Sequence, residues 1–96
     1  MLQYVIIAQD GKDYDAIDRR KEIRPLHLAA AKKMKENNNL IIGGAILDDD
    51  GNMRGSVMMV QFETEDDFKN WYANEPYITG GVWKVIEVRK FRVAEV

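Results

Sequence analysis

The sequence contains no cysteine and only one histidine among its 96 residues. Without cysteine there is no disulfide, no thiolate nucleophile, no iron–sulfur cluster and no cysteine zinc site. A single histidine argues against most zinc and non-haem iron sites within one chain. We therefore expect no metal site and no cofactor, and only a carboxylate site for Mg²⁺ or Ca²⁺ stays open at this point.

Long hydrophobic runs and an excess of basic charge are also absent. No apolar run reaches the length of about 18 residues that a membrane helix needs, and no signal-peptide pattern is present. We therefore expect a cytoplasmic protein with no membrane partner. The 14 basic residues against 16 acidic ones give a formal net charge of −2, which does not support nucleic-acid binding. The length fits a single domain, 1–96, with one modest core.

The order of strand and helix signals predicts the fold. Runs rich in β-branched and aromatic residues predict four strands, at 2–8, 40–47, 54–62 and 82–92. Helix formers predict helices at 14–23, 25–38 and 65–74. With the first two joined as one helical region, the order is β-α-β-β-α-β. This is the ferredoxin-like α+β arrangement, a four-stranded antiparallel sheet with the helices on one face.

Pro25 is expected to kink or restart the first helical region, because proline fits the first position of a helix and cannot donate to the preceding turn. From there Leu26, Ala30 and Met34 recur at i, i+4 and i+8, which predicts a core-facing stripe that His27 borders.

Two polar segments have local explanations. The acidic run 48–52 does not fit an EF-hand loop, and we expect a polar hairpin turn there instead of a calcium site. Thr64 is a good N-cap for the last helix, and one asparagine of 37–39 is expected to take the left-handed cap of the first.

The strands are apolar on both faces, which predicts an assembly. In the third strand Val57 and Met59 point one way, and Met58, Val60 and Phe62 point the other. Two helices cover only one face of a four-stranded sheet, so the second face would expose a large apolar patch. A second copy packed sheet on sheet is the simplest cover, and we predict a homodimer.

The segment 19–28 carries the first candidate site. It holds His27 directly beyond Pro25 and Leu26, with Arg24 and Arg20 about one and two helical turns before it. A cationic strip beside a half-buried histidine suits a small anionic molecule and a proton transfer. The alternative is a histidine hydrogen-bonded to backbone, beside solvated arginines.

Glu75 is the second candidate, because Pro76 restricts its backbone to extended values. A carboxylate near His27 would orient the imidazole and stabilise its charged form. The alternative is a solvated carboxylate at the end of a helix. Gly43–Gly44 lies within a strand, which is typical of a bulge or of a close approach to the backbone. Ser56 is a weak candidate nucleophile but a plausible ligand contact.

Together these segments resemble the YciI-like (YCII-related) family. The matching marks run in order along nearly the whole chain: 4–10, Arg20, 24–28, Gly43–Gly44, Gly55–Ser56, 75–77 and 80–82. The resemblance implies a dimeric α/β barrel related to muconolactone isomerase-like enzymes, among which is a dehydrochlorinase of chlorinated hydroquinone breakdown. It also implies an active site of a histidine and the aspartate of an Asp-Pro pair. Those positions match His27 and Glu75, so a glutamate replaces the aspartate.

The leading hypothesis is a small cofactor-independent lyase or isomerase acting on an anionic or enolisable small molecule. His27 would be the general acid/base and Glu75 its partner. The expected substrate contacts are Arg20, Arg24, Gly44, Ser56 and Tyr77. The alternatives are a non-catalytic ligand-binding dimer of the same pocket and an accessory domain that only dimerises.

Overall fold

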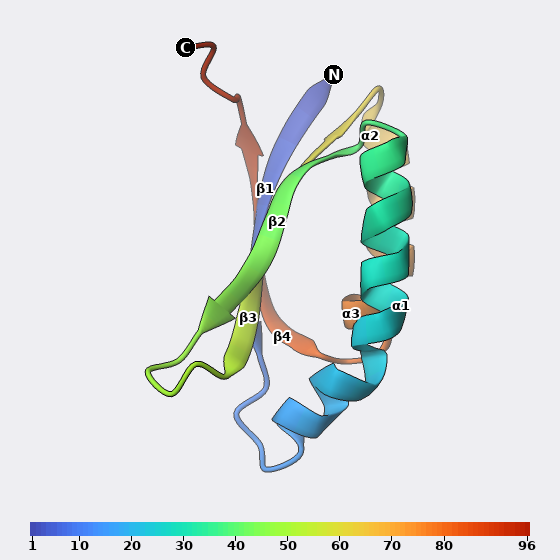
Figure 1. Cartoon of the computed structure of the whole chain (residues 1–96). Coiled ribbons are helices and arrows are strands. Elements are labelled where there is room, and N and C mark those ends of the chain that lie inside the picture. The colour runs from blue at the N-terminus through green and yellow to red at the C-terminus, as the bar shows by residue number, and fades with distance from the viewer.

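The computed structural model describes residues 1–96 and shows one sheet with its helices on one side (Figure 1). The elements follow in the order β1 (Leu2–Asp10), α1 (Ala16–Glu36), β2 (Leu40–Leu47), β3 (Met53–Phe62), α2 (Glu65–Asn74), α3 (Pro76–Thr79) and β4 (Trp83–Phe91). The strands lie in the order β2-β3-β1-β4, and every neighbouring pair is antiparallel. The predicted ferredoxin-like α+β fold is confirmed.

The first helical region differs from its prediction. α1 is one continuous helix with Pro25 inside it, so a restart at Pro25, one of the two predicted outcomes, is wrong. Proline removes the bond that its N–H would donate to the carbonyl of Lys21. Both Pro25 and Lys21 are exposed, so water can satisfy that carbonyl and the helix passes through. His27 therefore lies in the middle of a helix and not in a first turn.

The buried side of α1 also differs from the predicted stripe. Leu26 is 62% exposed, whereas Arg20 is buried and Ile23 and Met34 pack against the core. His27 is on this inward side, at i+4 from Ile23 and i+7 from Arg20. The apolar pattern misleads here because the side facing the sheet carries an arginine and a histidine.

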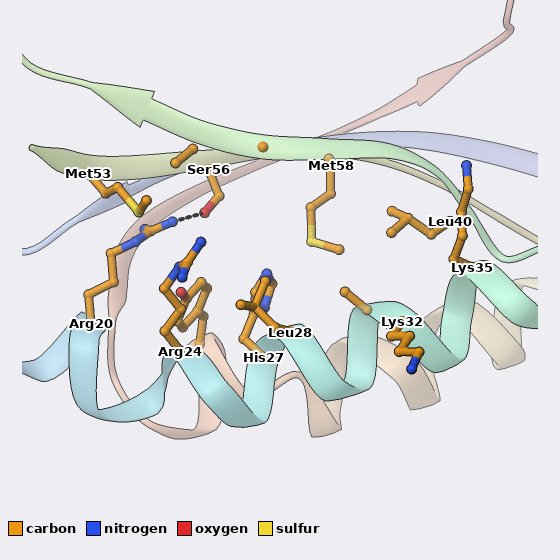
Figure 2. A pocket seen from close by; sticks show the side chains of 15 residues that line it. Arg20, Arg24, His27, Leu28, Lys32, Lys35, Leu40, Met53, Ser56 and Met58 are labelled. Carbon is orange, nitrogen blue, oxygen red and sulfur yellow. Dashed lines mark hydrogen bonds between the residues drawn. The ribbon is translucent and has the colours of Figure 1, made fainter. Parts of the chain in front are cut away.

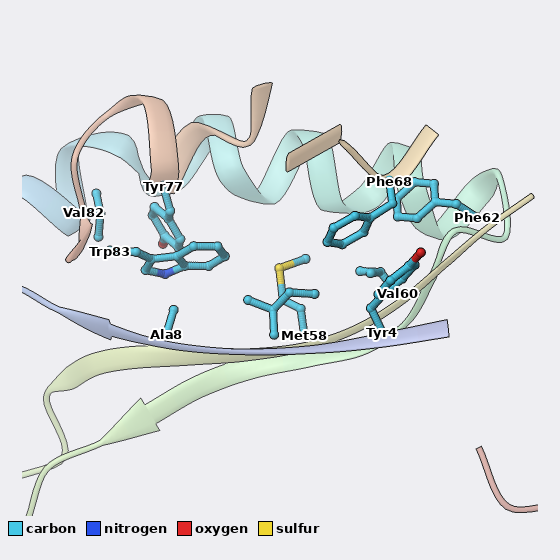
Figure 3. Close-up of a cluster of buried hydrophobic side chains, with 10 residues drawn as sticks. Tyr4, Ala8, Met58, Val60, Phe62, Phe68, Tyr77, Val82 and Trp83 are labelled. Carbon is cyan, nitrogen blue, oxygen red and sulfur yellow. The ribbon is translucent and has the colours of Figure 1, made fainter. Parts of the chain in front are cut away.

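The core fills the space between the helices and the inner sheet face (Figure 3). Phe68 of α2 stacks on Tyr4 of β1 with ring centroids 4.0 Å apart. Thr64 Oγ1 accepts a 3.1 Å bond from the Asp67 N–H, which confirms the predicted cap of α2. At the end of α1 Asn38 has a φ of 62°, which confirms the left-handed asparagine.

The outer sheet face carries no helix in this chain. Its paired residues include Val5 with Met59 and Ile7 with Val57, as the strand alternation predicts. Apolar side chains are exposed along this face on three strands, including Ile7, Ile42, Ile46 and Val85. None of the helices is both long enough and apolar enough to cross a membrane.

Candidate functional site

His27 and Glu75, which are 48 positions apart in the sequence, lie in direct contact between α1 and α3. Glu75 ends α2 in extended backbone and caps α3, where Pro76 occupies the first turn. Its Oε2 accepts a 2.6 Å bond from the Tyr77 backbone N–H, and its Oε1 meets His27 Nδ1. The Glu75 side chain is only 2% exposed, so it is not a solvated helix end. Although a glutamate replaces the aspartate implied by the resemblance, its carboxylate still reaches the imidazole.

The imidazole plane is fixed by aromatic neighbours. The ring of Tyr77 stacks on His27 with centroids 3.9 Å apart and planes within 12°, and Trp83 meets it edge-on at 6.1 Å. Because an ionised carboxylate only accepts hydrogen bonds, Nδ1 carries the proton toward Glu75. Nε2 makes no hydrogen bond within the chain, and His27 borders a cavity. The unshared nitrogen is therefore the one available to a ligand.

A second polar group, centred on Arg20, is buried beside this pair. Arg20 Nη1 donates to both Asp10 carboxylate oxygens at 3.0 Å, and Nη2 donates to Ser56 Oγ at 2.9 Å. Trp83 Nε1 donates to the same Oγ at 3.1 Å. Both terminal nitrogens of Arg20 are thus engaged inside the protein, and its guanidinium lies 4.6 Å over the Tyr77 ring.

Sequence reasoning missed Asp10 and Trp83 as members of the site. Asp10 looks like the start of a turn, and Trp83 looks like a core or interface aromatic. One signal for Asp10 was available: it follows Tyr4, Ile6 and Ala8 at alternate positions of β1, which places it on the inward face. Trp83 has no comparable sequence signal, because its hydrogen bond joins it to a strand 27 positions earlier.

A cavity of about 400 Å³ opens between α1 and the strands β2 and β3. Figure 2 shows Arg20, Arg24 and His27 extending from α1 toward Ser56 and Met58 on the sheet. The cavity contains every residue predicted as a substrate contact: Arg20, Arg24, Gly44, Ser56 and Tyr77. Glu75 is not in its lining and lies behind His27.

The cavity is cationic although the chain has a net charge of −2. Four of its lining residues are basic, namely Arg20, Arg24, Lys32 and Lys35, and none is acidic. Asp10 compensates Arg20, whereas Arg24 forms no ion pair within the chain. Such a lining favours an anionic ligand.

The two β2 glycines leave their part of the strand open. Neither Gly43 nor Gly44 has a positive φ, and a Cβ added to Gly44 would meet nothing within 4 Å. The strand irregularities lie on either side, between Leu40 and Ile42 and between Ile46 and Leu47. Nothing inside the chain therefore requires a glycine at position 44, which lies at the cavity edge.

Tyr77 supplies a neutral hydroxyl. Burial raises the pKa of Tyr77 above its usual 10.0, and Asp10 and Glu75 act in the same direction against the opposing influence of Arg20 and Arg24. The phenol therefore stays protonated at neutral pH and can donate a hydrogen bond. The Tyr77 hydroxyl makes no hydrogen bond within the chain.

No group of three or more His, Cys, Asp or Glu side chains that could hold a metal ion is found.

Fold and site together define the class: a ferredoxin-like domain with a histidine–carboxylate pair against a cationic cavity. The chain belongs to the YCII-related domain family, which matches residues 2–92. It is 30% identical over 95 residues to the protein YciI of Escherichia coli, covering 93% of this chain and 95% of that one. It is 32% identical over 97 residues to an uncharacterized protein of Haemophilus influenzae, covering 95% and 97% respectively. The family resemblance seen in the sequence is confirmed.

Solved structures share the fold at lower identity. A 5-chloro-2-hydroxyhydroquinone dehydrochlorinase from Burkholderia phenoliruptrix, in complex with 2,5-dihydroxybenzoquinone, superposes with a TM-score of 0.81 at 22% identity, over 96% of this chain and 95% of that one. A dimeric ferredoxin-like protein of unknown function from Jannaschia gives a TM-score of 0.60 at 13% identity, over 97% and 100%. An antibiotic biosynthesis monooxygenase gives 0.59 at 13% identity, over 99% and 100%.

Proposed function

We propose that this protein is a cofactor-independent lyase or isomerase that moves a proton on an anionic or enolisable small molecule. His27 is the general acid/base, and Glu75 orients and stabilises it. The observation that carries the proposal is the buried Glu75 carboxylate on His27 Nδ1, which leaves Nε2 free at the cavity.

The chemistry requires a base beside a carbon acid and stabilisation of the charge that forms. Nε2 removes a proton from a carbon next to a carbonyl, and the C–H electron pair moves into the enolate. The imidazolium that results is stabilised by Glu75. Return of the proton to another carbon gives an isomerisation. Expulsion of a leaving group with its electron pair gives an elimination.

The charge of the cavity supports an anionic substrate. Neither Arg24 nor Lys32 forms an ion pair within the chain, but Figure 2 shows Arg24 extending toward the sheet and Lys32 pointing away from it. Lys35 extends the positive lining along α1. Lys35 already donates to the Ile41 carbonyl at 2.9 Å, so Arg24 is the stronger candidate for direct anion contact. The dehydrochlorinase with a related fold makes chlorinated hydroquinones and hydroxylated quinones a reasonable first class to test.

The test is proton exchange and turnover with a panel of enolisable anions. The purified protein is incubated in D₂O with small keto acids and with 5-chloro-2-hydroxyhydroquinone, and deuterium incorporation and chloride release are followed. For an active compound, His27→Gln should lower the rate roughly 10²- to 10⁴-fold. Glu75→Gln should lower it as well, while Glu36→Gln, at the exposed end of α1, should not.

The competing function is non-catalytic ligand binding, and the same panel separates the two. Binding of 2,5-dihydroxybenzoquinone, followed by its absorbance and weakened in Arg24→Gln, together with no exchange or turnover of any compound, would support the binding module. Exchange that survives in His27→Gln would exclude His27 as the base.

We also propose that the protein forms a homodimer through the outer sheet face. Exposed Ile7, Ile42 and Val85 give this face its apolar character, and a neighbour of the same fold is dimeric. Light scattering after size exclusion should give twice the chain mass. Ile7→Glu should yield monomers, whereas Leu26→Glu, on the exposed side of α1, should leave the dimer intact.

A further inference from the structure

Ser56 has an unused proton that points to a ligand. A hydroxyl offers two lone pairs and one O–H donor. Arg20 Nη2 and Trp83 Nε1 donate to Ser56 Oγ at 2.9 and 3.1 Å, which occupies both lone pairs. The O–H has no acceptor within the chain, although Ser56 is only 2% exposed and lines the cavity. Its remaining hydrogen bond is therefore directed to whatever occupies the cavity.

The buried Arg20 guanidinium strengthens this donor through its bond to Ser56 Oγ. Asp10 holds Nη1 through both carboxylate oxygens, so the guanidinium is fixed beside Ser56. A hydroxyl that accepts from a guanidinium is polarised and donates more strongly. The position of the donor is also fixed before any ligand arrives, because Trp83 holds the same oxygen from another strand.

Tyr77 supplies a second donor of the same kind. Its hydroxyl also has no acceptor within the chain, and the residue lines the same cavity. Figure 3 shows the Tyr77 ring extending from α3 toward the sheet, next to Trp83. The ring is stacked on His27 at 3.9 Å, so the phenol is tied to the base whose Nε2 faces the ligand. Two neutral donors thus accompany one base in one cavity.

We propose that Ser56 and Tyr77 are the donors of an oxyanion site, which binds the substrate oxygen that becomes negative when His27 removes the proton. The role of His27 in this statement rests on the function proposed above, whereas oxyanion binding by the two hydroxyls does not. The site would take a planar enolate or phenolate oxygen, and Arg24 would hold a permanent anionic group of the same molecule. This defines the substrate class as anions that also carry an enolisable carbonyl or a phenol.

The experiment uses para-nitrophenolate as a coloured oxyanion, at a pH where the probe is ionised. Its dissociation constant is measured by absorbance for the wild type, Ser56→Ala, Tyr77→Phe and the control Tyr72→Phe. Loss of one hydrogen bond to a charged oxygen should weaken binding roughly ten- to a hundredfold. The wild type and Tyr72→Phe should bind alike.

Tyr77→Phe is the decisive variant, because the hydroxyl it removes has no partner in the chain and the fold should be unaffected. Ser56→Ala removes an acceptor for two buried donors, so its thermal melt is checked first. Failure of the wild type to bind the probe, or an affinity within twofold of the wild type in Tyr77→Phe, would overturn the oxyanion site. Absence of proton exchange with every substrate, together with donor-dependent probe binding, would instead refute only the enzymatic function.

Discussion

Breaking the buried Arg20–Asp10 pair from one side should strongly destabilise the fold, and Asp10→Asn tests this. The two side chains are 5% and 2% exposed, and the guanidinium bonds both carboxylate oxygens at 3.0 Å. Asparagine keeps the size of the side chain but removes its charge, and its amide N–H₂ group faces donors of Arg20. The guanidinium then remains buried without a counter-charge, and Arg20 Nε already lacks a partner.

Breaking such a pair from one side should cost about 3–5 kcal/mol, because an uncompensated charge stays out of water. That is a large share of the roughly 5–15 kcal/mol by which a domain is stable. For a chain of this size, roughly 4–8 °C of melting temperature are lost per kcal/mol. Asp10→Asn should therefore lower the melting temperature by at least about 12 °C.

The chain supplies its own control in Arg19–Asp13, a second bidentate pair with bonds of 2.7–3.0 Å. Its side chains are 25% and 51% exposed, so Asp13→Asn should cost no more than about 1 kcal/mol. Urea unfolding of both variants gives the two free energies of unfolding. Adding Arg20→Met to Asp10→Asn should recover part of the loss, because it removes the stranded charge. Equal small losses in Asp10→Asn and Asp13→Asn would refute the reasoning.

Three further predictions concern a hairpin turn, a helix cap and a strand glycine. Backbone hydrogen bonds in the hairpin lower the pKa of Asp48 below its usual 3.8. The stabilisation from the ionised carboxylate is therefore complete above pH 3.8 and is lost as the pH falls through the lower pKa of the folded state. Amide exchange in the hairpin should show this acid dependence, and Asp48→Asn should abolish it. Thr64→Ala should cost about 1 kcal/mol in urea unfolding through loss of the α2 cap, and a cost near zero would contradict the capping role. A Cβ at Gly55 would collide with the Ala8 carbonyl oxygen, so Gly55→Ala should cost roughly 1–3 kcal/mol. A Cβ at Gly44 would meet nothing within 4 Å in the chain, so Gly44→Ala should not incur this steric cost, and equal destabilisation by both substitutions would refute the steric argument.

Features that depend on neighbouring residues followed from the sequence. The strands came from β-branched alternation, the α2 cap from Thr64 and the left-handed residue from the asparagine run. These are set by backbone preferences and side-chain bonds over three or four positions. The predicted order of elements then limited the topology to the ferredoxin-like arrangement, which the structure confirms.

The continuity of α1 did not follow from local rules. Pro25 weakens a helix by itself, and the apolar spacing pointed to Leu26 as a buried residue. The helix is held instead by packing of its inward side, including Ile23 and Met34, against the core. Tertiary contacts of this kind outweigh the loss of one backbone bond on the solvent side.

The candidate site was determined in its residue types by the sequence and in its geometry by the tertiary structure. The resemblance paired His27 with Glu75, but only the fold brings these positions, 48 apart, into contact. Arg20 was expected to meet a ligand, yet its terminal nitrogens bond Asp10 and Ser56, which lie 10 and 36 positions away. A charged side chain bonds whatever the packed elements place within its reach, and burial makes those bonds necessary. Composition therefore identified a histidine, a carboxylate and cations, while the docking of α1 on the sheet decided that Arg20 is paired inside the protein and that Arg24 is not.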